Sequence, residues 1–198
     1  MRWSHCLTLF CFTLQWLLVS GSVTHRTIDD TYGDWVTHSQ VEYTGYWNAG
    51  QGCGGCAVQP NRAQAIEGTW HDTTSNSPNS ASTHSATLKF NGPYFRGLSI
   101  APRCRNESLT LGTAIWIYCI LANNASTGVT IFTNASFELD GTIVGGYGHN
   151  PDPSQGPFLY NVSVFQKTDL SNAEHTLVMI AMQEPEPSLL LFDYAVYT

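Results

Sequence analysis

Short segments with the side-chain pattern of β-strands make up most of this sequence. Ala86, Leu88 and Phe90 alternate with polar residues, which predicts a strand with one buried and one solvent-facing side. Residues 113–121 are apolar on both faces and rich in β-branched and aromatic side chains, as expected of a strand in the middle of a sheet. Residues 61–67 form at most a short helical turn, and no stretch has a convincing amphipathic helical pattern. The sequence therefore predicts an all-β chain.

A tight turn and regularly spaced further strands refine that prediction. Asp140 and Gly141 separate the strand-like residues 137–139 and 142–144, and Gly tolerates the positive φ that tight hairpin turns require. Further strand-like segments are residues 129–133, 160–165, 175–182 and 189–197. Short strands separated by loops rich in Gly, Pro and Asn are typical of a β-sandwich.

Alternation within the central segment predicts which of its side chains face the core. We expect residues 115–121 to be buried, with Ile117 and Cys119 on one face of the strand. Trp116 and Tyr118 should then share the opposite face.

The final strand is expected to close the sandwich. Simple alternation predicts that Phe192, Tyr194 and Val196 face the core, with Asp193 on the opposite face near a rim or a polar partner. Terminal strands of sandwiches usually pair near the beginning of the chain, so we expect Tyr194 to lie close to residues 28–35.

The N-terminal residues have the pattern of a secretory signal peptide. An uncharged apolar run from Leu7 to Val19 follows Arg2, and small residues come after it. We predict a signal peptide over residues 1–22 and one β-sandwich domain over residues 23–198, of a size that buries a real core. An uncleaved signal anchor is the alternative. The predicted location is secreted and extracellular, and we predict no membrane-spanning segment in the mature chain.

The polar surface is expected to be weakly charged and glycosylated. Charged residues make up 12% of the chain and the net charge is −7, whereas average domains have roughly 25% charged residues. The few basic residues argue against a nucleic-acid partner. Four Asn-x-Ser sequons predict a glycoprotein, with acceptors at Asn106, Asn124, Asn134 and Asn161.

Four cysteines follow the predicted signal peptide, at positions 53, 56, 104 and 119, and they allow three pairings. A disulfide between Cys53 and Cys56 is favoured because the two glycines between them let the backbone turn tightly and the export route is oxidising. A redox or zinc role for this pair is the alternative, but no βαβ pattern or second cysteine pair accompanies it. We expect Cys119 to be a buried free thiol.

Several motifs lie in order along nearly the whole of residues 23–198. They are Thr27-Ile-Asp-Asp30 with Gly33-Asp34, Trp47, Cys53-Gly-Gly-Cys56, Gly68-Thr-Trp-His-Asp72, Ile117-Tyr-Cys-Ile-Leu121, Phe137-Glu-Leu-Asp-Gly141, His175-Thr-Leu177 and Phe192-Asp-Tyr-Ala-Val-Tyr-Thr198. Together they resemble a family of uncharacterised secreted and surface proteins of mushroom-forming (basidiomycete) fungi. The resemblance implies a galactose-binding-like jelly-roll β-sandwich.

Residues 93–112 depart from the pattern of that family. There, a strand ending like Phe90-Asn-Gly92 runs directly into one beginning like Thr113-Ala-Ile, whereas here about 20 residues intervene. These residues are either a translated intron or a genuine inserted loop. If the intron hypothesis is right, Cys104 and the Asn106 sequon are absent from the natural protein.

Candidate metal ligands and catalytic groups are few. Asp29, Asp30 and Asp34 surround Gly33 and could offer oxygen ligands to a calcium ion, although such a cluster is more often a capped, solvated turn. His71 and Asp72 are neighbours in a strand and therefore point to opposite faces, so they form no relay by adjacency. We nominate no catalytic residue, expect no cofactor other than calcium, and favour a protein that is not an enzyme.

Aromatic residues in expected loops suggest a glycan-binding surface. Trp47, Trp70, Tyr94 and Tyr147 are the candidates for stacking on sugar rings. The predicted function is a secreted β-sandwich that binds carbohydrate or associates with a cell wall. The alternatives are a structural or interaction ectodomain without a small ligand and, third, a glycan hydrolase.

Overall fold

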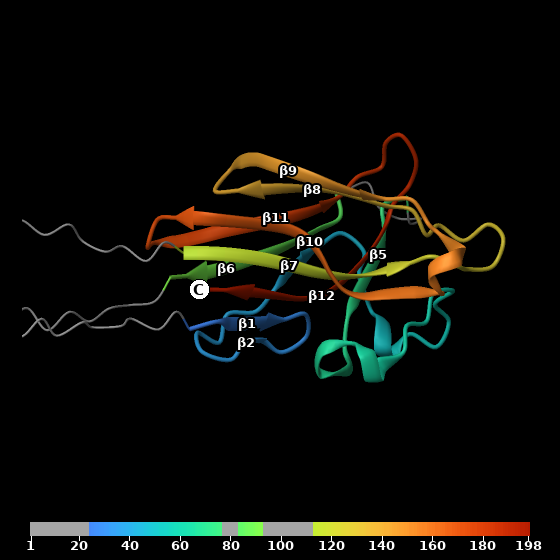
Figure 1. Ribbon diagram of the computed structural model, residues 1–198, viewed down its shortest axis with the longest axis horizontal. Helices are drawn as coiled ribbons and strands as arrows, with labels where there is room; N and C mark the ends of the chain where they lie inside the picture. The colour runs from blue at the N-terminus through green and yellow to red at the C-terminus, as the bar shows by residue number, and fades with distance from the viewer. Residues whose placement is uncertain (1–23, 77–82, 93–112) are drawn as a thin grey trace, which may run out of the picture.

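Two antiparallel β-sheets packed face to face form the protein (Figure 1), which confirms the predicted all-β jelly-roll sandwich. The computed structural model describes residues 24–76, 83–92 and 113–198. The predicted signal peptide, Tyr94, Cys104 and Asn106 lie outside these residues. Within the described ranges, the helical elements are short 3-10 turns, and none is long and apolar enough to cross a membrane.

The first sheet has seven strands and contains both ends of the described chain. Along it lie, in order, β10 (Phe158–Leu170), β7 (Thr113–Ala122), β12 (Leu189–Tyr197), β1 (Arg26–Asp29) and β2 (Gly33–Asp34). Two more strands join beside β12, namely β5 (His71–Thr74), which pairs with β12, and β4 (Asn48–Ala49), which pairs with β5.

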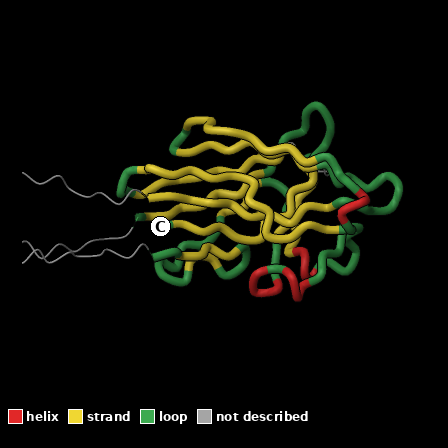
Figure 2. Tube along the Cα trace, in the orientation of Figure 1, coloured by secondary structure: helices red, strands yellow, loops and turns green. Residues whose placement is uncertain are grey.

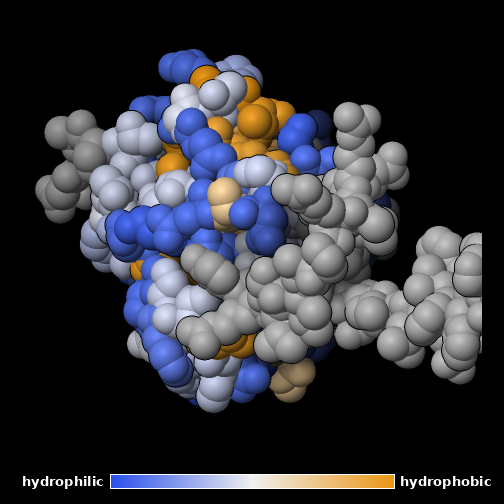
Figure 3. Space-filling model, turned by 90° about the vertical axis from the view of Figure 1, so that its left-hand side faces the viewer, coloured by the Kyte–Doolittle hydropathy of each residue, from blue (hydrophilic) through white to orange (hydrophobic). Residues whose placement is uncertain are grey.

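The second sheet has five strands. Their order is β3 (Glu42–Thr44), β6 (Ser85–Asn91), β11 (Glu174–Ala181), β8 (Thr133–Leu139) and β9 (Thr142–His149). The 3-10 turns η1 (Gly50–Gly52), η2 (Arg62–Gln64), η3 (Ile66–Gly68) and η4 (Pro153–Gln155) gather toward one end of the sandwich (Figure 2). The opposite end has a mostly hydrophilic surface with patches of hydrophobic side chains (Figure 3).

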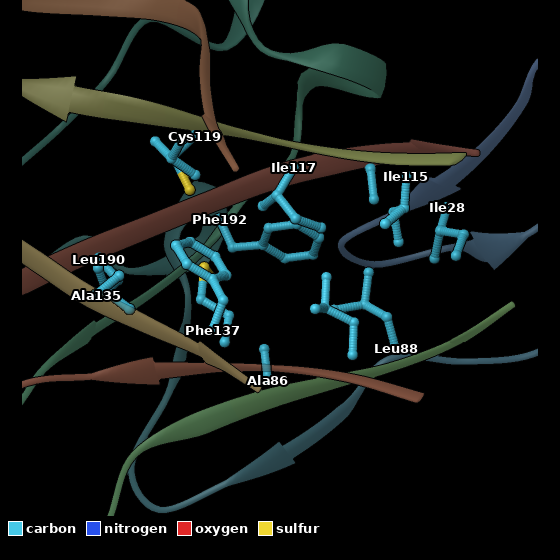
Figure 4. Close-up of a cluster of buried hydrophobic side chains, with 14 of the residues drawn as sticks. Ile28, Ala86, Leu88, Ile115, Ile117, Cys119, Ala135, Phe137, Leu190 and Phe192 are labelled. Atoms are coloured by element: carbon cyan, nitrogen blue, oxygen red, sulfur yellow. The ribbon is translucent and has the colours of Figure 1, made fainter. Parts of the chain in front are cut away.

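The core lies between the two sheets, where side chains from both inner faces meet (Figure 4). Ile117 and Cys119 of β7 are buried in this core, and Trp116 and Tyr118 on the other face are only half-buried. The predicted orientation of the central strand is therefore confirmed. Burial raises the pKa of the Cys119 thiol, as expected for a structural free cysteine.

The hairpin and the disulfide are also as predicted. Asp140 and Gly141 connect β8 to β9, and both have positive φ, at 51° and 79°. Cys53 and Cys56 form a disulfide.

The last strand differs from its predicted alternation. Phe192 faces the core, but the next core side chains are Ala195 and Tyr197 instead of Tyr194 and Val196. A β-bulge between Phe192 and Tyr194 in the pairing with β7 causes this change, because one extra residue moves every later side chain to the other face. The prediction that Tyr194 and Val196 enter the core is therefore wrong.

The bulge coincides with a change of partner strand. On one side of β12, residues 189–192 pair with β5 and residues 194–197 pair with β1. Tyr194 lies opposite Asp29, so the predicted proximity to residues 28–35 is confirmed. Asp193, at the junction of the two pairings, is completely buried.

Candidate ligand-binding hollow

Of the four aromatic residues predicted to bind sugars, the three that the structure describes, Trp47, Trp70 and Tyr147, do not form one site. Trp70 is only 1% exposed and packs in a second apolar cluster with Ile120 and Leu191, so the prediction that it contacts a ligand is wrong. Trp47 follows β3 and Tyr147 lies on β9, at opposite edges of the five-stranded sheet. Both are half-buried and pack against the core.

No local pattern predicts the burial of Trp70, which depends on a glycine distant along the chain. Gly50 lies so close to the indole that a Cβ atom there would approach Trp70 Nε1 to 1.8 Å. The residues around η1 therefore cover Trp70 tightly, and only the folded chain shows this contact.

A hollow of about 610 Å³ opens instead between the residues that follow β2, η3 and the strands β1 and β12. Ile28 of β1 faces the core, so the neighbouring Thr27 and Asp29 face outward into the hollow. Tyr194, which the bulge turns outward, lines it from β12. The other lining residues are Thr24, His25, Arg26, Trp35, Val36, Ile66 and Glu67.

The aromatic side chain of Trp35 lines this hollow and is 67% exposed. Tyr32, outside the lining, is 51% exposed, and its ring centroid lies 6.5 Å from that of Trp35. An exposed aromatic ring beside an open hollow offers a flat apolar surface to a ligand. Sequence reasoning missed both residues, although their position beside the Gly33-Asp34 turn could have suggested that they are exposed.

Asp34 fixes the loop that contains Trp35. Its carboxylate accepts hydrogen bonds from Val36 N at 2.8 Å, from Thr37 Oγ1 at 2.6 Å and from the Tyr197 hydroxyl. Burial by itself raises the pKa of Asp34, but these hydrogen bonds outweigh burial and lower it. Asp34 is therefore ionised and holds the Trp35 loop in place.

Asp29 lies at the floor of the hollow and is almost completely buried. Its Oδ1 accepts hydrogen bonds from Thr31 N at 2.9 Å and Tyr32 N at 2.8 Å, whereas its Oδ2 has no hydrogen-bond partner among the described residues. Burial raises the pKa of Asp29, and the negative charges of Asp30 and Glu67 add to that effect.

Asp193 lies behind the same floor. Its Oδ1 accepts a hydrogen bond from Ile66 N at 3.0 Å, and its Oδ2 has no partner in the described part of the chain. Burial, together with the charges of Asp30 and Asp29, raises the pKa of Asp193 to about 7. The main cause is burial, which disfavours the charged form of the carboxyl group.

Asp30 is fully engaged in the protein. Its carboxylate accepts from Thr69 Oγ1 at 2.6 Å and Thr31 Oγ1 at 2.8 Å, and its Oδ2 lies 2.6 Å from His71 Nδ1. His71 therefore pairs with Asp30 and not with its neighbour Asp72, as its strand position predicts.

The three carboxylates predicted to bind calcium do not form one site. Asp29 and Asp30 both contact the Thr69 hydroxyl, whereas Asp34 is directed to Tyr197 and to its own loop. In the described ranges, no group of three His, Cys, Asp or Glu side chains is placed to hold a metal ion.

One cluster outside the hollow superficially resembles a catalytic triad. His175 Nδ1 lies 2.7 Å from Asp140 Oδ2, and its Nε2 lies 3.3 Å from Ser171 Oγ. However, the same Nε2 lies 2.9 Å from the Ser171 carbonyl oxygen, which can only accept a hydrogen bond from it.

With acceptors at both ring nitrogens, His175 is held in its protonated form. Burial lowers its pKa, but the contacts to Asp140 and Ser171 outweigh burial and raise it. A protonated ring cannot act as the base for the Ser171 hydroxyl. The cluster therefore attaches the β8–β9 hairpin turn to the start of β11.

No family model and no curated protein sequence matches the chain. Similar solved structures include a Paenibacillus sp. cycloisomaltooligosaccharide glucanotransferase complexed with cycloisomaltoheptaose, with 11% identity and a TM-score of 0.43 over 78% of this chain and 18% of that one. An exo-β-1,3-galactanase from Phanerochaete chrysosporium with galactose has 10% identity and a TM-score of 0.42, over 90% and 30%. The CBM36-1 domain of a multidomain xylanase from the Trinervitermes trinervoides hindgut metagenome has 10% identity and a TM-score of 0.29, over 64% and 85%. This chain thus spans less than a third of the first two proteins, and the similarity is one of architecture alone.

Proposed function

We propose that the protein is a secreted, cell-wall-associated carbohydrate-binding module that binds glycans in the hollow between β1, η3 and the Trp35 loop. The observation that supports this proposal most directly is the 67% exposed indole of Trp35 at the wall of an open hollow with a polar floor. Sugar rings present apolar C–H faces and polar hydroxyl edges, so they suit a site that combines aromatic walls with a few polar groups.

The shape and rigidity of the hollow support the same function. Its volume of about 610 Å³ is within the usual range of small-ligand sites, roughly 300–1,000 Å³. Asp34 and Asp29 cap the backbone on either side of Tyr32 and Trp35, so both aromatic side chains belong to a loop fixed before any ligand arrives. A preformed site of this kind loses little conformational entropy on binding.

Secretion and glycosylation are part of this proposal. Asn124 and Asn161 are exposed, which suits glycan attachment. Asn134 is half-buried, and its side-chain amide donates a hydrogen bond to the Glu184 carbonyl at 2.8 Å. We expect glycans mainly at Asn124 and Asn161 among these three sequons.

A glycan array with the deglycosylated protein tests the function. Trp35→Ala should weaken binding to the array's ligands about tenfold or more, because it removes the largest stacking surface. Tyr46→Ala is the matched control, because Tyr46 is also an exposed aromatic residue but lies outside the hollow. Calcium should not change binding.

Two results would overturn the proposal. One is a wild-type protein that binds no glycan on the array. The other is a folded Trp35→Ala variant that binds as tightly as the wild type, because the hollow would then not be the site.

A further inference from the structure

We propose that the hollow prefers glycans built from amino sugars with a free, protonated amine over neutral glycans. This inference rests on the proposed function and adds the charge of the ligand. It starts from the buried Asp29, which lines the hollow and whose Oδ2 has no hydrogen-bond partner among the described residues. A buried carboxylate oxygen without a donor is costly, and a ligand that supplies N–H donors and positive charge offsets that cost.

A second carboxylate also lines the hollow. Glu67 lies in η3 at the rim of the hollow, and it is exposed. Its backbone is left-handed, with φ of 50°, which is uncommon for a residue other than glycine. Glu67 and Asp29 are close enough for their negative charges to interact.

Arg26 and His25 also line the hollow, and the side chain of each contacts an aromatic ring. The guanidinium of Arg26 lies 5.9 Å from the ring centroid of Tyr197, a core residue. His25 packs its ring against Trp116, with the centroids 5.9 Å apart. Asp30 is paired with His71, and Asp193, whose pKa is raised to about 7, is mostly uncharged at pH 6.

An ammonium group suits this arrangement for two reasons. It donates hydrogen bonds to carboxylates, and it is attracted to the faces of aromatic rings such as those of Trp35 and Tyr194. The net charge of −7 also attracts a polycationic glycan at longer range. An N-acetylated or hydroxylated sugar of the same shape offers neither the charge nor the additional donors.

Calorimetry with three hexasaccharides tests the preference. The probes are glucosamine hexamer, N-acetylglucosamine hexamer and cellohexaose, at pH 6 and low salt. The glucosamine hexamer should bind about tenfold more tightly than the other two, as expected for one or two partly solvated ion pairs. The advantage should shrink in 0.5 M salt, because salt screens charges.

Variants locate the effect in the hollow. Glu67→Gln should reduce the preference for the glucosamine hexamer at least about threefold, and it should not disturb folding because Glu67 is exposed. Asp29→Asn keeps an oxygen for Thr31 N and Tyr32 N but removes the charge, and it should reduce the preference further. Glu174→Gln is the control, because Glu174 is an exposed carboxylate on β11 of the other sheet and the substitution should leave the preference unchanged.

The outcomes separate the two proposals. Equal affinity for the three hexasaccharides overturns the preference for amines and leaves the glycan-binding function standing. If the preference for the glucosamine hexamer is unchanged in both Glu67→Gln and Asp29→Asn, the hollow is not its source and the proposal is wrong. Absence of binding to all three hexasaccharides, together with an empty glycan array, overturns both.

Discussion

At the scale of single residues, the most unusual group is the buried carboxyl of Asp193. Its pKa in the folded protein, about 7, lies well above the usual value of about 3.9 for an unfolded chain. The folded state therefore binds a proton that the unfolded state releases. The stabilisation of the folded state by this bound proton is fully present below about pH 4 and is lost as the pH rises through 7.

Asp193→Asn should remove this pH dependence. Asn keeps an oxygen that accepts from Ile66 N but carries no charge, so the variant should melt about 5 °C higher than the wild type at pH 8, equivalent to roughly 2 kcal/mol. At pH 4 the two proteins should melt at similar temperatures. Thermal melts between pH 4 and 8 measure the difference, and parallel curves for the two proteins would show that Asp193 is ionised throughout.

At the scale of elements, the connection from β6 to β7 is the most informative. Gly92, just after β6, lies so close to Thr113 at the start of β7 that a Cβ atom on Gly92 would approach Thr113 Oγ1 to 2.0 Å. The two ends of segment 93–112 are thus adjacent, and a short connection can replace it. This geometry accommodates both a translated intron and a genuine inserted loop, because either needs the two flanking residues to be adjacent.

Deletion of residues 93–112 should leave the sandwich intact. The variant should be secreted and should melt within a few degrees of the full chain, because a shorter connection between adjacent ends costs no more closure entropy than a long one. Transcript sequencing across residues 91–113 tests the intron directly. Unfolding of the deletion variant, or uninterrupted coverage of the segment in the dominant transcript, would favour a genuine loop.

At the scale of the whole molecule, β12 holds the seven-stranded sheet together. It pairs with β7 on one side and with both β1 and β5 on the other, and it places Leu190, Phe192, Ala195 and Tyr197 in the core. The last strand of the chain is therefore central in space (Figure 1).

Truncation after Pro187 should abolish secretion of folded protein. The loss of several buried side chains removes about 1.5–3 kcal/mol each, from a fold whose total stability is about 5–15 kcal/mol. The matched control is a chain lacking only Thr198, which should be secreted. Normal secretion of the truncated chain with an unchanged melting temperature would mean that β12 is not needed to close the sandwich.

The sequence by itself determined the features that depend on neighbouring residues. Alternation marked β6 and the faces of β7, Asp140-Gly141 marked the hairpin, and two glycines between Cys53 and Cys56 marked the disulfide, because strand period, turn conformation and short-loop closure are all local. Tertiary structure alone decided the outward turn of Tyr194, since a β-bulge arises from the registers of the partner strands, which the sequence of one strand does not contain. It likewise buried Trp70 and brought Asp29, Glu67 and Asp193 together, because these contacts join residues that are distant along the chain.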